Sequence, residues 1–257
     1  MKNDDILECS IFKPDDVICQ GTIIKFCNEN QQEYKYGIIV TGDCDIAQEK
    51  HGIYLSYCCI MPLEYYIKKF YIQKKCKNKL SKIIGQIKEN VFEILNRKLD
   101  DRAMEHVFSL SRNELDELLK NNGVVEKIID IQNYMHEGDF SLEEYKKMCS
   151  PKNKDFEKDI RNFPGDKFFI GNIPDPEINT EGFVVDFRRI KEIKRDEISK
   201  KYFGDIPNCF AIANLNSPYK QKMSQALGAM FSDLGLPESY ENNRNSIISK
   251  ISGEFIK

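Results

Sequence analysis

The spacing of the apolar residues changes twice along the chain, and these changes limit the folds that it can adopt. Near the N-terminus, β-branched and aromatic runs alternate with polar turns, as in Thr22–Phe26, Tyr34–Val40 and Ile53–Ile60. Such runs predict antiparallel strands. From Leu63 the apolar residues follow helical spacing instead. The clearest helical stripe comprises Leu80, Ile83, Ile84, Ile87, Val91, Ile94 and Leu95.

Short motifs place further helices and strands along the chain. Capping boxes at Ser111–Glu114 and Ser141–Glu144 predict the starts of two helices. Strand character returns at Lys167–Gly171 and at Gly182–Ile190, and a last helix is expected from Ser217 to Leu234. The buried stripe of this last helix is predicted to comprise Met223, Ala226, Leu227, Met230, Phe231 and Leu234.

The order of strands, helices, strands and helix favours one closed unit over two consecutive domains that divide near residue 160. An N-terminal sheet of three or four strands would leave an edge exposed, and the late strands have too few neighbours to form a sheet alone. We therefore expect an α+β fold, in which a small, mostly antiparallel β-barrel holds an inserted helical block and a C-terminal helix. The barrel strands are expected in residues 1–62, the helical insertion in 63–150, and the barrel-completing strands with the C-terminal helix in 165–257.

Charge and composition exclude several classes of protein. The formal net charge is −3, so no global charge attracts the chain to nucleic acid or to a membrane. The chain has no apolar run long enough to span a bilayer, and its first residues lack the pattern of a signal peptide. Nine scattered cysteines are expected to be free thiols in a reducing cytoplasm. We therefore expect a cytoplasmic protein without a membrane partner.

An acidic turn, Asp43-Cys44-Asp45, follows the apolar run Gly37–Val40 directly. At alternate positions of an extended backbone, the two carboxylates would point to the same face. Two carboxylates on one face repel each other unless a cation, a proton or hydrogen-bond donors lie between them. The turn is therefore the strongest candidate for a site in the first part of the chain.

Different partners for the acidic turn imply different functions. A divalent metal ion, held by Asp43 and Asp45, would suit a metal-dependent nuclease, with Glu64 as a third carboxylate. Backbone N–H groups would instead give an Asx-type turn that orders the loop. Arg188 and Arg189 on the late strand are candidate partners in a buried ion cluster. A divalent metal ion is the one cofactor that these alternatives include.

Two cysteine chemistries also involve the turn. Cys44 with His51 has the residue types of an activated nucleophile, but two flanking carboxylates raise a thiol pKa. Cys44, His51, Cys58 and Cys59 are residue types that bind zinc. The chain has no CxxC motif, and the adjacent Cys58 and Cys59 face opposite ways on a strand, so core thiols explain them better.

A lysine-rich stretch follows the predicted N-terminal strands and contains no acidic residue. Its lysines are Lys68, Lys69, Lys74, Lys75, Lys77, Lys79 and Lys82. The aromatic residues at its upstream end are Tyr65, Tyr66, Phe70 and Tyr71. Lysines neutralise phosphate groups and aromatic rings stack on bases, so this stretch predicts contact with nucleic acid. A simple solvent-exposed helix face is the alternative.

The segments Asp15–Ile18 and Ile38–Ile46 resemble an uncharacterised group of bacterial proteins with an "SxDCDI"-like strand end. That group often has a closing "SPY…GLP" helix, which is similar to Ser217–Pro237. The resemblance implies an association with ATPases and other components of mobile elements and phage defence. The first seventy residues also resemble, more loosely, the small barrel of the PemK/MazF ribonuclease toxins. The loop Asn28–Glu33 lacks the basic residue that the toxins have in their first hairpin.

These observations lead to three hypotheses of function. The first is an accessory or recognition subunit of a bacterial defence-type system, which binds nucleic acid or a partner ATPase. In it, the acidic turn shapes a ligand-facing loop and the lysine-rich stretch contacts phosphate. The second is a metal-dependent nuclease that uses Asp43 and Asp45. The third is a purely structural protein-interaction domain.

Overall fold

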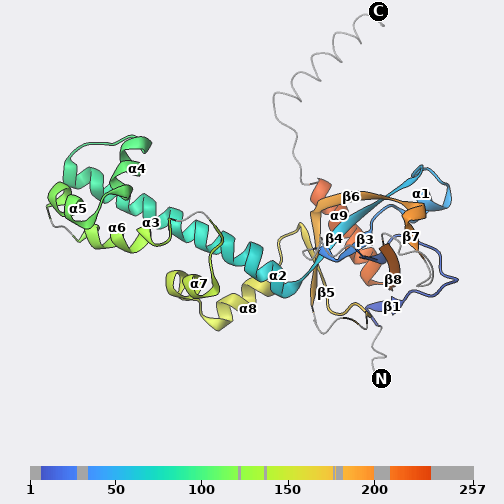
Figure 1. Ribbon diagram of the computed structural model, residues 1–257. Helices are drawn as coiled ribbons and strands as arrows, with labels where there is room; N and C mark the ends of the chain where they lie inside the picture. The colour runs from blue at the N-terminus through green and yellow to red at the C-terminus, as the bar shows by residue number, and fades with distance from the viewer. Residues whose placement is uncertain are drawn as a thin grey trace, which may run out of the picture. The chain divides into compact units, whose positions relative to one another are not determined.

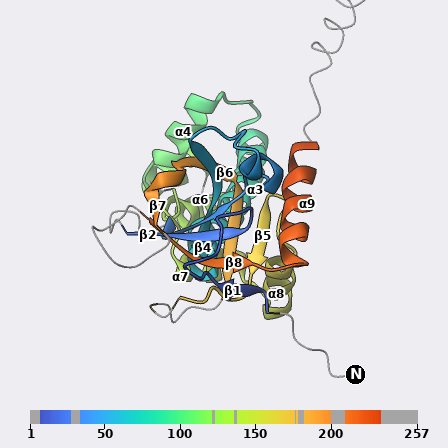
Figure 2. The ribbon, with the colours of Figure 1, turned by 90° about the vertical axis from the view of Figure 1, so that its right-hand side faces the viewer.

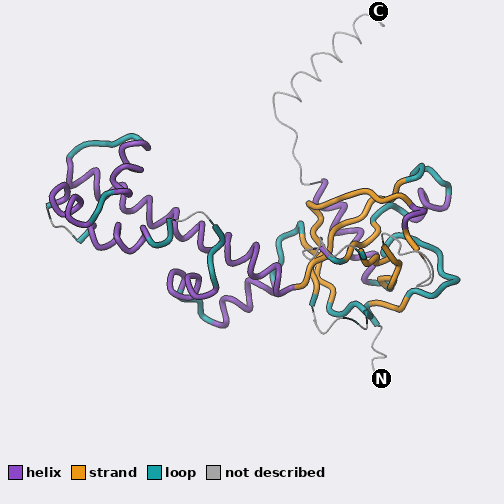
Figure 3. The backbone as a smooth tube through the Cα atoms, in the orientation of Figure 1, coloured by secondary structure: helices purple, strands orange, loops and turns teal. Residues whose placement is uncertain are grey.

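The computed structural model describes residues 7–27, 34–120, 123–135, 138–175, 177, 182–199 and 209–232. The chain divides into two units. The sheet unit comprises Met1–Pro62 and Phe163–Lys257, and the helical unit comprises Leu63–Asn162. Figure 3 shows strands in the sheet unit alone, whereas the described residues of the helical unit form helices and loops. In sequence, therefore, the helical unit interrupts the sheet unit once.

One sheet organises the sheet unit (Figure 1). Its described strands have the order β1-β8-β2-β3-β4-β6-β5, and the short β7 pairs in parallel with β8. The strands are β1 (Cys9–Ile11), β2 (Thr22–Phe26), β3 (Tyr36–Ile39), β4 (Tyr54–Pro62), β5 (Lys167–Ile170), β6 (Phe183–Lys194), β7 (Ile198–Ser199) and β8 (Cys209–Leu215). All other pairs are antiparallel. The late strands β5 and β6 therefore join the early strands in one sheet, as the sequence predicts, and the unpredicted β8 joins the same sheet.

The sheet curls into a half-barrel without closing, and this corrects the predicted β-barrel. The outer strands β1 and β5 are three and four residues long, and each has one neighbour among the described strands. A side-chain hydrogen bond, and not a ladder of backbone hydrogen bonds, joins the end of β1 to the end of β5. The carboxylate of Glu8 accepts a hydrogen bond of 2.6 Å from the backbone N–H of Gly171. The protein is thus a mixed α and β fold in which two short edges approach but do not pair.

Two parts of the sheet differ from the sequence prediction. The segment Val17–Cys19 has the β-branched residues of a further N-terminal strand but forms a loop. The strand β8 is not predicted, although its residues alternate between buried and half-buried positions. Alanine and asparagine supply several of these positions, and their low strand propensity hides the alternation.

A bulge interrupts β6 in the middle of the sheet. The adjacent residues Cys58 and Cys59 of β4 pair with Ile190 and Asp186 of β6. The three residues of β6 between Asp186 and Ile190 therefore have no partner on β4. The extra residues turn Phe187 into the core, where it is fully buried, and leave Arg188 and Arg189 on the surface. Bulges redirect side chains in this way, and a period-two pattern in the sequence does not predict them.

Helix α9 (Tyr219–Ser232) covers one side of the sheet, as Figure 2 shows. Its Met223 is fully buried in the main core of the sheet unit. Three further residues of the predicted stripe pack partly against this core, namely Ala226, Leu227 and Met230. Phe231 is predicted to be buried but is 51% exposed, whereas the adjacent Met230 is the residue that packs against the core. Leu234, also in the predicted stripe, lies outside the described residues.

The helical unit is built around the long helix α3 (Ile72–Leu95). The short helix α2 (Leu63–Tyr66) and the π-helical turn η2 (Ile67–Tyr71) lead into it directly. The first half of α3 packs with α7 and α8, and the second half packs with α4, α5 and α6. These shorter helices are α4 (Asp101–Ser109), α5 (Arg112–Leu119), α6 (Val124–Gln132), α7 (Leu142–Cys149) and α8 (Asn153–Arg161).

Local sequence signals explain where several of these helices begin and end. Ser111 and Ser141 form the predicted capping boxes with Glu114 and Glu144. Helix α8 is not predicted, and it extends the helical unit to Asn162, beyond the expected limit at residue 150. Among the described helices, none has both the length and the apolar character needed to cross a membrane.

Candidate functional site

The lysine-rich stretch lies at the start of the helical unit. Lys68 and Lys69 belong to η2, and the other five lysines belong to the first half of α3. All seven residues are exposed, because buried residues such as Ile72, Cys76 and Ile87 occupy the other side of the helix. We use the name lysine face for Lys74, Lys75, Lys77, Lys79 and Lys82.

Three of the seven lysines form ion pairs at the protein surface. The pairs join Lys68 to Glu64, Lys69 to Asp139 and Lys75 to Asp159, with N···O distances of 2.5, 2.8 and 2.6 Å. Within the described residues, the other four, Lys74, Lys77, Lys79 and Lys82, have no ion pair. Exposed ion pairs are worth about 0–1 kcal/mol, so a phosphate group can compete for their lysines. The lysine face therefore keeps an uncompensated positive charge.

The four aromatic residues beside the lysines contact one another or helices of the same unit, and of the four Tyr66 is buried while Tyr65, Phe70 and Tyr71 are half-buried. These contacts leave less ring surface for the base-stacking role that the sequence suggests. Tyr66 is 6% exposed, and its ring stacks on Phe70 with 6.0 Å between centroids. Tyr65 meets the same ring edge-on at 6.3 Å. The ring of Tyr71 packs edge-on against Phe156 at 5.4 Å, and its hydroxyl donates a hydrogen bond of 2.8 Å to a carboxylate of α8. These contacts hold η2 and the start of α3 in place.

The acidic turn forms part of a short helix, α1 (Asp43–Ala47), and not the extended strand end that the sequence predicts. Two positions apart on a helix, Asp43 and Asp45 point in different directions, so the carboxylates do not share a face. Both oxygens of Asp43 accept hydrogen bonds. The donors are the backbone N–H of Gln20 and the ammonium group of Lys220, each at 2.8 Å. Asp43 therefore joins α1 to the loop before β2 and to α9.

The geometry does not assemble the carboxylates as a metal site. Within the described part of the chain, no group of three or more His, Cys, Asp or Glu side chains is placed to hold a metal ion. Glu64, the expected third carboxylate, pairs with Lys68 in the helical unit. Asp45 lies on the exposed side of α1, where the thiol of Cys44 is 3.9 Å from its Oδ1. The geometry thus favours the structural alternative for the turn.

Arg188 and Arg189 have partners other than the acidic turn, which corrects the predicted ion cluster. Arg188 Nε lies 2.5 Å from Asp166 Oδ2, and Arg189 Nε lies 3.4 Å from Asp186 Oδ2. The guanidinium group of Arg189 also lies 4.7 Å from the ring centroid of Tyr34. The β6 bulge directs both arginines to these neighbours.

The cysteines and the histidine near the turn do not form a zinc site or a nucleophile pair. Cys58 and Cys59 are buried in β4, and burial raises the pKa of both thiols, that of Cys58 to about 12. Cys44 is exposed. Both ring nitrogens of His51 are buried and have no hydrogen-bond partner within the described residues. Thiols with a raised pKa remain protonated at neutral pH, so they suit core packing better than metal binding.

Replacing Asp43 with alanine is expected to lower the free energy of unfolding by about 1 kcal/mol, because both hydrogen bonds of its partly exposed carboxylate are lost. The matched control is Asp45→Ala, which changes the same charge on the same helix. It is expected to stay within about 0.5 kcal/mol of the wild type. Urea unfolding of the three proteins measures the difference. Equal effects of the two substitutions would contradict the structural role of Asp43.

A buried ion-pair network, which the sequence does not predict, lies in the sheet unit. Lys25 on β2 is 6% exposed, and its Nζ lies 2.8 Å from Asp175 Oδ2 and 2.5 Å from Glu177 Oε2. The hydroxyl of Tyr36 on β3 donates a hydrogen bond of 2.8 Å to Asp175 Oδ2. The neighbouring Ile173 is buried in the main core. The network therefore fastens the segment after β5 onto the sheet.

The protonation of the network follows from these contacts. Burial raises the pKa of Asp175. Hydrogen bonds from Lys25, the Glu177 N–H and Tyr36 lower this pKa by more than burial raises it, so the net shift is downward. Burial lowers the pKa of Lys25, but the two carboxylates raise it above its ordinary value. Burial and the hydrogen bond to Asp175 raise the pKa of Tyr36. The lysine and Asp175 are therefore charged at neutral pH, and the tyrosine is neutral.

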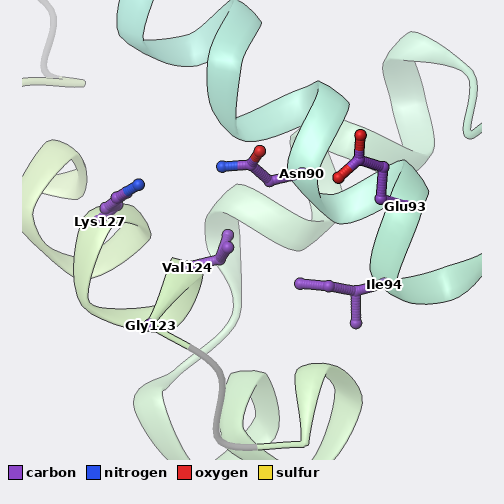
Figure 4. A pocket seen from close by; sticks show the side chains of 6 residues that line it. All are labelled: Asn90, Glu93, Ile94, Gly123, Val124 and Lys127. Carbon is purple, nitrogen blue, oxygen red and sulfur yellow. The ribbon is translucent and has the colours of Figure 1, made fainter.

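The helical unit also has open pockets. One of about 360 Å³ lies between α3 and α6 (Figure 4). Its lining comprises Asn90, Glu93, Ile94, Gly123, Val124 and Lys127. The charged side chains in this lining, Glu93 and Lys127, have opposite signs, so the pocket does not select an anion or a cation. The lysine face remains the stronger candidate for binding.

Comparison of the sequence with models of protein families, with characterised proteins and with solved structures found no match. The assignment of function therefore depends on the chain's own residues, and within the part of the chain that the structure describes the lysine face is a cluster of exposed positive charge.

Proposed function

We propose that this chain is a cytoplasmic accessory or recognition subunit that binds nucleic acid through the lysine face. The observation that supports this most directly is the set of exposed lysines on the first half of α3, four of which have no ion pair within the described residues. Lysines that neutralise phosphates release condensed counterions, which provides sequence-independent affinity. From the resemblance to the bacterial proteins with an "SxDCDI"-like strand end, we also propose that the chain belongs to a bacterial defence system and binds a partner ATPase.

The acidic turn has a structural role in this proposal. The contacts of Asp43 with Gln20 and Lys220 join parts of the sheet unit and involve no group that performs chemistry. The metal-dependent nuclease has no comparable support, because its expected ligands Asp43, Asp45 and Glu64 are engaged in other contacts or point apart. The proposed activity is therefore binding and not hydrolysis.

The test is fluorescence anisotropy of labelled nucleic acid over a series of salt concentrations. The variant Lys74→Gln/Lys79→Gln/Lys82→Gln removes three of the four lysines without an ion pair and keeps long, helix-compatible side chains. It is expected to weaken binding on the order of tenfold and to reduce the slope of log K against log salt by about 2–3.

The matched control variant is Lys98→Gln/Lys120→Gln/Lys127→Gln. These residues are exposed, belong to the same unit and give the same change of net charge. Binding by the control is expected to equal that of the wild type. Equal losses in both triple variants would show an effect of net charge alone. Absence of wild-type binding at low salt would overturn the proposal.

A further inference from the structure

The aromatic rings beside the lysine face are buried or half-buried, so they offer little of the stacking surface that recognition of single strands needs. Proteins that bind single strands combine a basic groove with exposed aromatic rings on which bases stack. The aromatic residues next to the lysines instead contact one another or the helices α7 and α8. Tyr66 and Tyr71 are the clearest cases, since one is 6% exposed and the other uses its hydroxyl within the unit. A ligand of this face is therefore held through its phosphates.

The spacing of the lysines matches the two sides of a groove. The rise of an α-helix is about 1.5 Å per residue, so Lys74 and Lys82 are separated by about 12 Å along α3. The major groove of B-form DNA is about 12 Å wide. Lysines at the two ends of the lysine face can therefore reach phosphates on opposite strands. A single strand does not present two phosphate rows at this spacing.

The strength of phosphate binding also favours a duplex. Duplex DNA carries one negative charge per about 1.7 Å of its axis, and it releases more counterion per neutralised phosphate than a single strand does. The segment from Lys68 to Lys88 contains no arginine, so it has no planar fork for bidentate contact with a base edge. Lysine acts mainly as a point charge, so its contacts depend little on base sequence.

From these three observations we infer that the lysine face binds duplex DNA through its two backbones, in preference to single strands and without regard to sequence. This inference rests on the proposed function and names its substrate class. Affinity comes from the lysines of α3, and the packed aromatic residues hold the helix in place without touching the DNA.

The experiment is a competition measured by anisotropy, with a labelled duplex bound to the full chain. The competitors are the same duplex without label, each of its two separated strands, and a duplex of unrelated sequence. We expect both duplexes to compete equally, and the single strands to compete about tenfold more weakly. The variant Lys74→Gln/Lys79→Gln/Lys82→Gln should lose this preference together with affinity, whereas Lys98→Gln/Lys120→Gln/Lys127→Gln should keep both.

The outcomes separate the inference from the proposed function. Single strands that compete as well as the duplex would overturn the inference and leave nucleic-acid binding in place. A strong preference between the two duplex sequences would also overturn it, because point charges on phosphates do not read bases. No binding of the labelled duplex or of labelled single strands would overturn both the inference and the proposed function.

Discussion

Replacing Lys25 with methionine is expected to lower the free energy of unfolding by about 3–5 kcal/mol. The substitution leaves Asp175, which is 8% exposed, as a charge without its cationic partner in the interior. Among the described residues, the hydroxyl of Tyr36 is then the remaining side-chain donor to this carboxylate. Removal of one member of a buried ion pair costs more than the pair contributes, because the desolvated charge that remains is uncompensated.

Equilibrium urea unfolding measures this loss, and the chain offers a close control. Lys35 lies beside the same network, with its Nζ 3.6 Å from Glu177 Oε2, but its side chain is 44% exposed. The substitution Lys35→Met is therefore expected to cost less than about 1 kcal/mol. If Lys25→Met costs no more than Lys35→Met, the network does not stabilise the fold in the way described.

The same network gives a defined pH dependence. The pKa of Asp175 is lowered in the folded state, so its contribution is present above the ordinary carboxyl pKa of about 3.9 and is lost as the pH falls through the folded-state value. The pKa of Lys25 is raised, so its contribution is present below about 10.4 and is lost as the pH rises through the folded-state value. The difference in stability between the wild type and Lys25→Met should therefore be constant near neutral pH and shrink in acid.

The helices and strands that depend on local periodicity could be predicted from the sequence. The strands β2, β3 and β4, the helix α3 and the capping boxes of α5 and α7 all follow from patterns within about ten residues of each position. The strands β1 and β8 and the half-barrel could not be predicted in this way. They depend on pairing between Cys9–Ile11 and Cys209–Leu215, which are separated by most of the chain.

The candidate site shows the same limit. The exposed lysines of α3 follow from the apolar stripe on the same helix, so their position could be predicted. The role of the neighbouring aromatic residues could not, because their partners, such as Phe156, lie on helices far along the chain. The sequence contains one indication of the buried ion-pair network, since Lys25 is the single charged residue in the run Thr22–Phe26. Its partner Asp175 lies in a loop, where no periodicity indicates a buried residue.

The acidic turn illustrates a third kind of error. Its sequence suggests two carboxylates on one face because the preceding strand is extended up to Ile39. The backbone instead begins a helix at Asp43, after Gly42. The three residues between the strand and the acids are enough to change the direction of each side chain. The function inferred from a motif therefore depends on a boundary that the motif does not specify.

Replacing Gly37 with alanine is expected to lower the free energy of unfolding by about 1–3 kcal/mol. Gly37 lies in the buried strand β3, opposite Cys59 of β4, and the ring of Tyr57 passes over it. A Cβ atom at this position would lie 2.6 Å from Tyr57 Cδ2 and 3.1 Å from Tyr57 Cε2. The ring is itself packed against Phe26, with 5.3 Å between centroids, so it cannot move away without loss of that contact.

The same substitution at Gly85 is the matched control, because a Cβ atom added there meets nothing within 4 Å and the position is an exposed part of α3. Gly85→Ala is expected to stabilise the protein by about 0.5–1 kcal/mol, since alanine favours a helix interior over glycine. In a Tyr57→Ala background, Gly37→Ala should lose most of its cost, because the obstructing ring is absent. Urea unfolding of this cycle decides the cause. An equal cost of Gly37→Ala in both backgrounds would show that the backbone at Gly37, and not the ring above it, requires glycine.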